Sequence, residues 1–213
     1  MLQLDHLFVC VEPEPAEADI LRTLGLTVEF RREHVGQGTR NQLVLFAEHY
    51  LELLWLADRT EAETNLVRLD RRVDWKTTGA SPFGIALRGP KESAPDVPWT
   101  LYELEGFPVN LWLDQRTLDD PRLPLVFVFD QSESEAVSGG PRHGAFPPAF
   151  LQHGCGATGI QHAIIEGPGL GDAAQLPLPP QVQLRDGPAP CLSVTLAGPQ
   201  PVCGVAGQLL RLT

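Results

Sequence analysis

The chain lacks an excess of positive charge, a long apolar segment and any close pair of cysteines. Its 16 Lys and Arg residues face 27 Asp and Glu residues, which gives a formal net charge of -11 and a sequence pI of about 4.9. Nucleic acids and anionic lipids require a basic surface, so we expect neither a nucleic acid nor a membrane as partner. No apolar run approaches the roughly 20 residues that span a bilayer.

The first six residues and the cysteines point to a reducing compartment. No positively charged stretch followed by an apolar core opens the sequence, so we predict no signal peptide. The cysteines, none of which forms a C-x-x-C motif, are Cys10, Cys155, Cys191 and Cys203. This spacing excludes a zinc knuckle and a thioredoxin-type motif. We therefore expect free thiols and a cytoplasmic location.

What the sequence does contain favours one packed domain made of short elements. The 213 residues fit a single domain, or two small similar halves, and the 43% of hydrophobic residues suffice for a core. The 20 Gly and 20 Pro predict many turns rather than long helices.

The first 56 residues predict the order strand, helix, strand, strand, strand. A buried strand is expected at residues 4–11, and strands with alternating or apolar patterns at 27–34, 41–47 and 50–56. Between the first two strands, residues 16–24 carry apolar side chains at helical spacing. Pro15 suits the start of this helix, and Gly25 suits its end.

The remainder predicts one exposed helix and otherwise strands and loops. The helix spans residues 61–75, with Thr60 as its N-cap. Strands are expected at 83–87, 99–104, 109–113, 125–129 and 159–165, followed by three short strands that end at 209–212. Loops are expected at 132–148 and 167–180. The predicted fold class is α+β.

Two groups of residues carry a resemblance to a known superfamily. The strand Leu4-Asp5-His6-Leu7 and the strand Tyr50-Leu51-Glu52-Leu53 open and close a βαβββ unit that resembles the first module of the vicinal oxygen chelate superfamily. Glyoxalase I, extradiol dioxygenases and bleomycin-resistance proteins belong to it. The segment His34-x-Gly-x-Gly-Thr39-Arg-Asn41 and the segment His153-Gly-Cys-Gly-Ala157 resemble the glyoxalase-like domain group in particular. The resemblance implies paired βαβββ modules in a cup-shaped mixed sheet, with residues 1–58 as the first module and 59–213 as degenerate later modules short of helix.

The resemblance also implies a divalent metal held by His6 and Glu52. Imidazole and carboxylate suit Zn, Ni, Fe, Mn or Co, and such a metal polarises a carbonyl or enediolate. The second pair of ligands departs from the family pattern, because Gly84 stands at the expected histidine. His162 is the candidate third ligand. A catalytic site normally has three protein ligands, so the cofactor is either a divalent metal or none.

Further candidates surround this pair. Glu52, flanked by leucines, needs a partner or a solvated cavity and is also the candidate catalytic residue; the alternative is a salt bridge to Arg40. For His34, Thr39 and Asn41 we weigh substrate contact against a glycine-dependent turn that ties down backbone groups. Residues that we expect either to contact substrate or to be structural are His153 and Trp112.

Three classes of function remain open at this point. The first is a metal-dependent lyase, isomerase or dioxygenase that acts on a small oxygen-rich molecule. The second is a metal-free protein that binds and sequesters a small molecule, as resistance proteins of this superfamily do. The third is a degenerate module that serves a structural or regulatory partner. The superfamily also often builds its cup across a homodimer.

Overall fold

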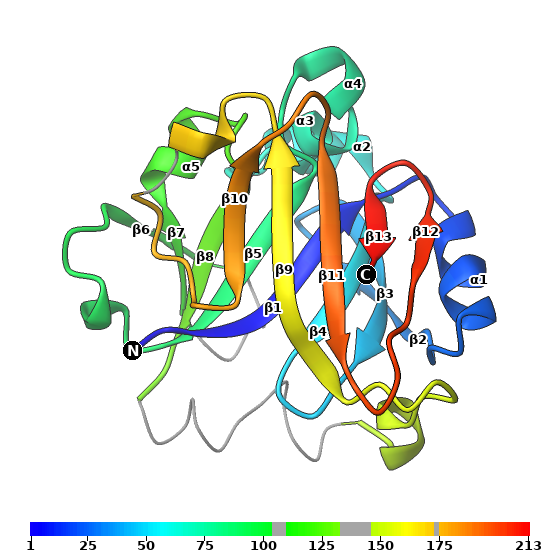
Figure 1. Cartoon of the computed structure of the whole chain (residues 1–213). Helices are drawn as coiled ribbons and strands as arrows, with labels where there is room; N and C mark the ends of the chain where they lie inside the picture. Colours follow the sequence, from blue (N-terminus) through cyan, green and yellow to red (C-terminus); the bar gives the residue numbers. More distant parts are fainter. Residues whose placement is uncertain (104–109, 133–145, 173–174) are drawn as a thin grey trace.

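Two β-sheets form the framework of the chain. The computed structural model describes residues 1–103, 110–132, 146–172 and 175–213. An eight-stranded sheet has the order β2-β3-β4-β1-β5-β8-β7-β6, and a five-stranded sheet has the order β10-β9-β11-β13-β12. In Figure 1 the five-stranded sheet lies in front of the eight-stranded one. The predicted α+β class is confirmed, and the cup shape stays a prediction.

The first half of the large sheet has the predicted βαβββ order. Its elements, in sequence, are β1 (Gln3–Cys10), α1 (Ala16–Thr23), β2 (Glu29–His34), β3 (Thr39–Leu45) and β4 (Tyr50–Leu56). β1 pairs with β4 in parallel, and β3 lies antiparallel to both β4 and β2. Gly25 follows the helix with φ 85°, a left-handed conformation that suits glycine. Its predicted role at the end of the helix is confirmed.

The second half repeats the strand order of the first. Its elements are β5 (Phe83–Gly89), η1 (Lys91–Ser93), β6 (Trp99–Tyr102), β7 (Leu111–Asp114), α5 (Gln115–Asp119) and β8 (Leu125–Asp130). β5 pairs with β8 in parallel and with β1 antiparallel, so the two halves meet at their first strands. The crossover between β5 and β6 holds a 3₁₀ turn of three residues where the first half has an α-helix. The ends of the strands predicted at 99–104 and 109–113 lie outside the described residues.

The five-stranded sheet follows from residue 159. The elements of this part are η3 (Pro148–Leu151), β9 (Gly159–Gly167), η4 (Leu170–Asp172), β10 (Val182–Asp186), β11 (Cys191–Ala197), β12 (Gly204–Ala206) and β13 (Leu210–Leu212). Four strands therefore follow residue 180, where three were expected. β12 and β13 have three residues each, too few for an alternating pattern to be recognised in sequence. Most of the loop predicted at 132–148 lies outside the described residues.

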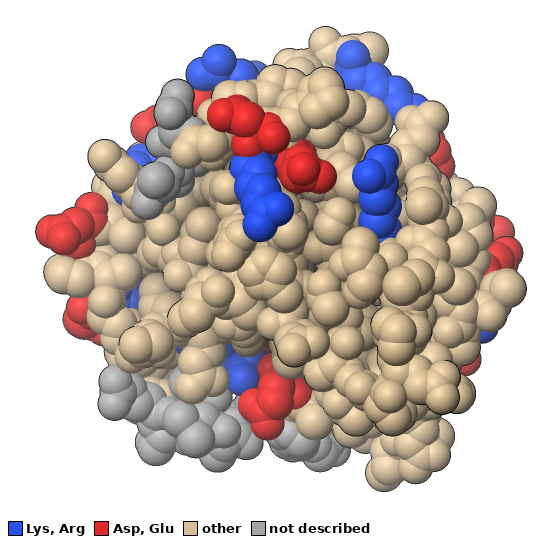
Figure 2. All heavy atoms as spheres, viewed as in Figure 1, with Lys and Arg blue, Asp and Glu red and all other residues tan. Residues whose placement is uncertain are grey.

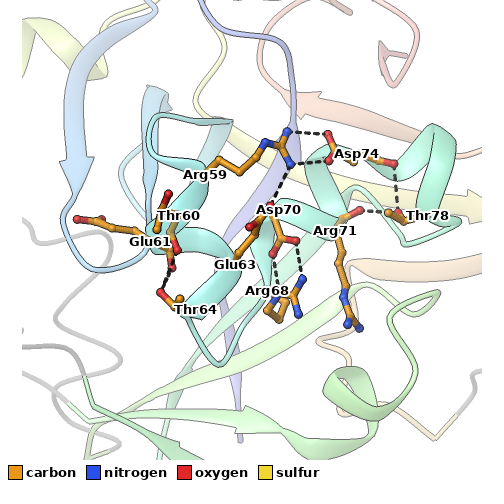
Figure 3. Close-up of polar contacts among 10 residues, drawn as sticks. All are labelled: Arg59, Thr60, Glu61, Glu63, Thr64, Arg68, Asp70, Arg71, Asp74 and Thr78. Atoms are coloured by element: carbon orange, nitrogen blue, oxygen red, sulfur yellow. Dashed lines mark hydrogen bonds and ion pairs between the residues drawn. The ribbon is translucent and has the colours of Figure 1, made fainter.

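The helix predicted at 61–75 is instead three short helices, α2 (Arg59–Thr64), α3 (Leu69–Val73) and α4 (Trp75–Thr78). Asn65 is extended and Arg68 has φ 51°, so the helical path breaks between α2 and α3. The N-cap is Asp58, whose side chain accepts a hydrogen bond from the backbone of Glu61. Figure 3 shows ion pairs that brace this segment, from Arg59 to Asp74 and from Arg68 to Asp70.

One face of this helical segment is buried, contrary to the exposed helix that we expected. Arg72 is 2% exposed, and its guanidinium donates to four backbone carbonyls, which belong to Ser81, Thr117, Pro121 and Leu123. These carbonyls precede β5 and β8 or lie in α5. Arg72 therefore fastens the helices to the second half of the large sheet. The longest described helix has eight residues, and none in the described part of the chain could span a membrane.

The eight-stranded sheet has a different apolar cluster on each face. Alternate residues of β1, such as Leu7 and Val9, pack toward the five-stranded sheet and α1. Phe8 and Cys10 point to the opposite face, where they meet Val67 and Leu69 from the helical segment. We call this face of the eight-stranded sheet, which carries Phe8 and Cys10, the inner face. The other side of the five-stranded sheet is exposed, and its strands carry only four charged residues, Glu166, Arg185, Asp186 and Arg211 (Figure 2).

Candidate functional site

Buried polar side chains gather on the inner face, beside the junction of the two halves. His6 shares this face of β1 with Phe8, and Glu52 lies opposite Phe8 on the adjoining strand β4. His6 is 3% exposed and Glu52 is 5% exposed. Burying these groups costs free energy unless they find partners.

Two carboxylates hold the His6 ring. The Nδ1 atom of His6 lies 2.7 Å from Asp5 Oδ1, and its Nε2 atom lies 3.3 Å from Glu52 Oε2. Burial alone would lower the pKa of His6, but the hydrogen bonds to Asp5 and Glu52 outweigh it and raise the pKa to about 9. Arg88 stands behind Asp5, with Nη1 3.9 Å from Asp5 Oδ2. The centre therefore contains an imidazolium between two carboxylates.

Asn41 holds the other side of Glu52. Its Nδ2 atom donates to Glu52 Oε1 at 2.6 Å, and its Oδ1 atom accepts from the backbone N–H of Arg32 at 3.0 Å. This second bond fixes the amide orientation, because only an oxygen can accept from a backbone N–H. Burial opposes ionisation of Glu52, but the bonds from His6 and Asn41 hold its pKa below the usual range. The expected alternative partner, Arg40, instead pairs with Glu33 at 2.7 Å.

His34 and Thr39 extend the network. His34 Nε2 lies 3.3 Å from Asn41 Nδ2, and His34 Nδ1 lies 3.0 Å from Thr39 Oγ1. Since Asn41 Nδ2 is a donor, His34 Nε2 is the acceptor, and a neutral imidazole then donates from Nδ1 to Thr39. Five of the predicted site residues thus form one connected chain, which runs through His6, Glu52, Asn41, His34 and Thr39.

Aromatic rings flank the polar centre. Tyr50 stacks on His6 with the ring centroids 4.2 Å apart and the planes inclined by 16°. Phe127 meets the other side of His6 edge-on at 5.6 Å, and Phe129 lies 6.0 Å away. Tyr50 and Phe127 are half-buried, whereas His6 is almost fully enclosed. The polar centre is therefore set in an aromatic wall.

The remaining predicted site residues lie elsewhere. His153 accepts a hydrogen bond from the backbone of Thr27 and lies 2.9 Å from the Leu45 carbonyl oxygen. His162 pairs with Thr195 on the exposed side of the five-stranded sheet. Trp112 packs against the cluster between the two sheets and has Lys91 Nζ 4.7 Å above its ring. None of the three joins the network around His6 and Glu52 that the structure describes.

Comparison with known proteins assigns the chain to a family. A sequence profile of the glyoxalase-like domain matches residues 4–176. The chain belongs to the glyoxalase-like domain family. Through it the chain is a member of the vicinal oxygen chelate superfamily, and the segments that carried the resemblance include five residues of the network. None of the curated proteins compared with this glyoxalase-like domain is significantly similar to it.

Solved structures share the fold at low sequence identity. A hypothetical protein from Staphylococcus aureus is 14% identical with a TM-score of 0.60, and the match covers 99% of this chain and 98% of that one. Methylmalonyl-CoA epimerase from Mycobacterium tuberculosis is 14% identical with a TM-score of 0.41, over 63% of this chain and 91% of its own. The first likeness shows the fold of the entire glyoxalase-like chain.

In the second half of this glyoxalase-like domain, the two positions that correspond to His6 and Glu52 do not carry metal ligands. Gly84 takes the place of His6 in β5, and the ring of Phe8 lies where a Gly84 β-carbon would stand. In the first half, Glu52 pairs with Phe8, and Phe8 follows His6 by two residues. In the second half, Phe127 pairs with Ala86, and Ala86 follows Gly84 by two residues. Phe127 therefore takes the place of Glu52.

The described residues do not fit a complete metal centre. Among the described residues, no three His, Cys, Asp or Glu side chains are grouped so that they could hold an ion. The acidic residues that end β7 and β8 have other partners, since Asp114 caps α5 and pairs with Arg116, and Asp130 accepts from the Lys91 backbone. The expected convergence of His162 with His6 and Glu52 is not found.

Asp5, Tyr50 and the two phenylalanines of β8 were missed in the sequence. Strict alternation would point Asp5 away from His6, but the β1–β5 pairing shifts register between Leu4 and His6. Asp5 therefore contacts the ring of its own neighbour. The only signal in the sequence was its position next to His6. Phe127 and Phe129 read as ordinary core residues of a strand.

Proposed function

We propose that this glyoxalase-like protein binds a small organic molecule at the Asp5–His6–Glu52 centre and does so without a divalent metal. The observation that carries the proposal is the replacement of the second ligand pair by Gly84, under the Phe8 ring, and by Phe127. Among the residues that the structure describes, this leaves two protein ligands, fewer than a catalytic metal site normally has. The activity class is the metal-free binding or sequestration expected as an alternative from the sequence.

The polar centre is poorly explained by stability alone. Replacing buried ionic groups by apolar side chains of similar size is often neutral or stabilising. Here two carboxylates and an imidazole lie nearly buried, beside half-buried aromatic rings. Clusters of this kind are typical of sites that recognise a ligand. A structural or regulatory module would not need this arrangement.

A metal-dependent lyase, isomerase or dioxygenase is the second candidate. One observation favours it: His6 Nε2 and Glu52 Oε2 are 3.3 Å apart, so both can face one cation. Zn, Ni, Fe, Mn or Co would each accept this pair. A cytoplasmic location and a homodimer stay predictions.

Metal analysis and ligand titration separate the two candidates. Untagged protein, purified without chelator, is analysed for metal, and Co²⁺ is then titrated and followed by visible absorption. We expect the purified protein to contain far less than one equivalent of metal per chain. We also expect that added Co²⁺ gives no absorption bands that depend on Glu52, as a comparison with Glu52→Gln would show. In the same protein, small aromatic molecules should shift the amide NMR signals of residues 5, 6, 41 and 52. Stoichiometric metal that is lost in Glu52→Gln, but kept in the matched control Glu33→Gln, would overturn the proposal.

A further inference from the structure

We propose that the ligand of this site is an aromatic molecule whose head group donates a hydrogen bond and is neutral or positively charged. The inference rests on the proposed function and specifies the class of ligand. Three features of the inner face support it: the charge balance of the polar centre, the hydrogen-bonding capacity that it leaves unused, and the aromatic wall.

The charge balance disfavours an anion. Three carboxylates belong to the centre and its immediate support, those of Asp5, Glu52 and Glu48, the last lying 3.3 Å from Arg88 Nη2. Arg88 and His6 supply at most two positive charges, and His34 adds none, because its Nε2 atom accepts a hydrogen bond from Asn41. The summed charge of these groups is therefore negative whether His6 is charged or neutral, and the formal net charge of the whole chain is -11. An incoming carboxylate or phosphate would meet like charge, and the two described cations of the centre, Arg88 and His6, already face carboxylates.

The donors of the centre are already engaged. Both ring nitrogens of His6 face carboxylates, and Asn41 uses its amide nitrogen on Glu52 and His34. The carboxylates of Asp5 and Glu52 are acceptors only, and each oxygen can take more than one hydrogen bond. The spare capacity is therefore for accepting, and the matching ligand group is a hydroxyl, an amide N–H or an ammonium.

The aromatic wall selects the body of the ligand. Phe127 and Phe129 lie 5.7 Å apart in an edge-on pair, and Tyr50 stacks across His6. Aromatic rings attract other rings and also cations placed over their faces. Phe127 stands in the second half at the position that Glu52 has in the first half. The second half of the site therefore offers an apolar contact where the first half offers a carboxylate.

Three naphthalene probes with the same ring system test the inference. The ammonium 2-naphthylmethylamine, the neutral 2-naphthylmethanol and the anion 2-naphthoate are titrated into isotope-labelled protein and followed by amide NMR. We expect the amine and the alcohol to bind at least tenfold more tightly than the carboxylate. Cyclohexylmethylamine should bind at least threefold more weakly than the naphthyl amine, and Phe127→Leu should reduce this difference. Glu52→Gln should narrow the gap between amine and carboxylate, whereas Glu33→Gln should keep it.

The outcomes distinguish the inference from the proposed function. If naphthoate binds as tightly as the amine, with shifts at residues 6 and 52, the ligand class is wrong and the binding site stands. If no naphthalene probe shifts these residues, the inference is overturned as well. Co²⁺ binding that depends on Glu52 would overturn the proposed function itself. If Glu52→Gln fails to fold, the relative affinities of the three probes for the unaltered protein still test the ligand class.

Discussion

The ring of Phe8 fills the space directly over Gly84, on the strand that pairs with its own. A β-carbon at residue 84 would collide with the Cε1 atom of Phe8. Gly84 has an ordinary extended backbone, so the requirement for glycine comes from this close approach. The contact leaves no room for a ligating side chain at residue 84.

Gly84→Ala is therefore expected to destabilise the protein. The added methyl group must displace the Phe8 ring within the inner cluster, at a cost of about 1–3 kcal/mol for overpacking. Urea denaturation measures the free energy of unfolding. Phe8→Leu should reduce the effect of Gly84→Ala when the two are combined. Gly154→Ala is the control, because its nearest contact would be an ordinary 3.5 Å. Equal effects at residues 84 and 154 would show that the Phe8 ring does not restrict residue 84.

Local patterns predicted most of the first half, and the family resemblance predicted the central pair of the site. The helix at Ala16–Thr23 and the four strands around it follow from apolar spacing and from Gly25. The pair of His6 and Glu52 was predicted from the resemblance to the vicinal oxygen chelate superfamily, and the alternation of the two strands is consistent with it. The partners Asp5 and Phe127 could not be predicted in this way, because one depends on a register shift and the other on the repeat of the fold. Arg72 was assigned to an exposed helix, since its carbonyl acceptors lie up to 51 residues away in sequence.

His49 makes stability depend on pH. Its Nε2 atom lies 2.9 Å from the backbone nitrogen and 2.8 Å from the carbonyl oxygen of Ile160, and so joins the two sheets. Burial and the charge of Arg88 lower the pKa of His49 to about 4. The unfolded chain therefore binds a proton more readily than the folded one. The contribution of His49 to the free energy of unfolding is fully present above pH 6.5 and is lost as the pH falls toward 4. The loss is on the order of 3 kcal/mol.

Denaturation midpoints between pH 7.5 and 4 measure the contribution of His49. His49→Gln should lower stability at neutral pH and flatten its decline toward acid. His153, whose pKa burial also lowers, keeps part of the decline. His162→Gln, on the exposed side of the five-stranded sheet, should leave the curve unchanged. A decline that is as steep in His49→Gln as in the unaltered protein would exclude His49 as its source.

Asn41→Asp should convert a supporting contact into repulsion. Asn41 Nδ2 donates to Glu52 Oε1 at 2.6 Å, and a carboxylate there cannot donate when ionised. We expect a loss of about 2–4 kcal/mol at pH 7 from like charge and a lost buried hydrogen bond. One of the two carboxyls then has a raised pKa in the folded state, so part of the stability returns as the pH falls through it. The exposed Gln161→Glu is the control, and pH-dependent urea denaturation reads both.

Glu61 fastens the helical segment to the turn between β2 and β3. Its Oε2 atom accepts from the backbone N–H groups of Gly36 at 2.8 Å and Gly38 at 3.1 Å, and a β-carbon at Gly38 would collide with the Asp58 carbonyl. Glu61→Ala leaves both N–H groups without this acceptor, so we expect a loss of about 1–2 kcal/mol and faster hydrogen exchange at residues 36 and 38. Glu63→Ala removes a carboxylate from the same helix, where it lies 3.8 Å from Arg59 at the surface. It should change neither measurement by much, because exposed ion pairs contribute about 0–1 kcal/mol. Equal exchange rates in the two variants would mean that the turn keeps its shape without Glu61.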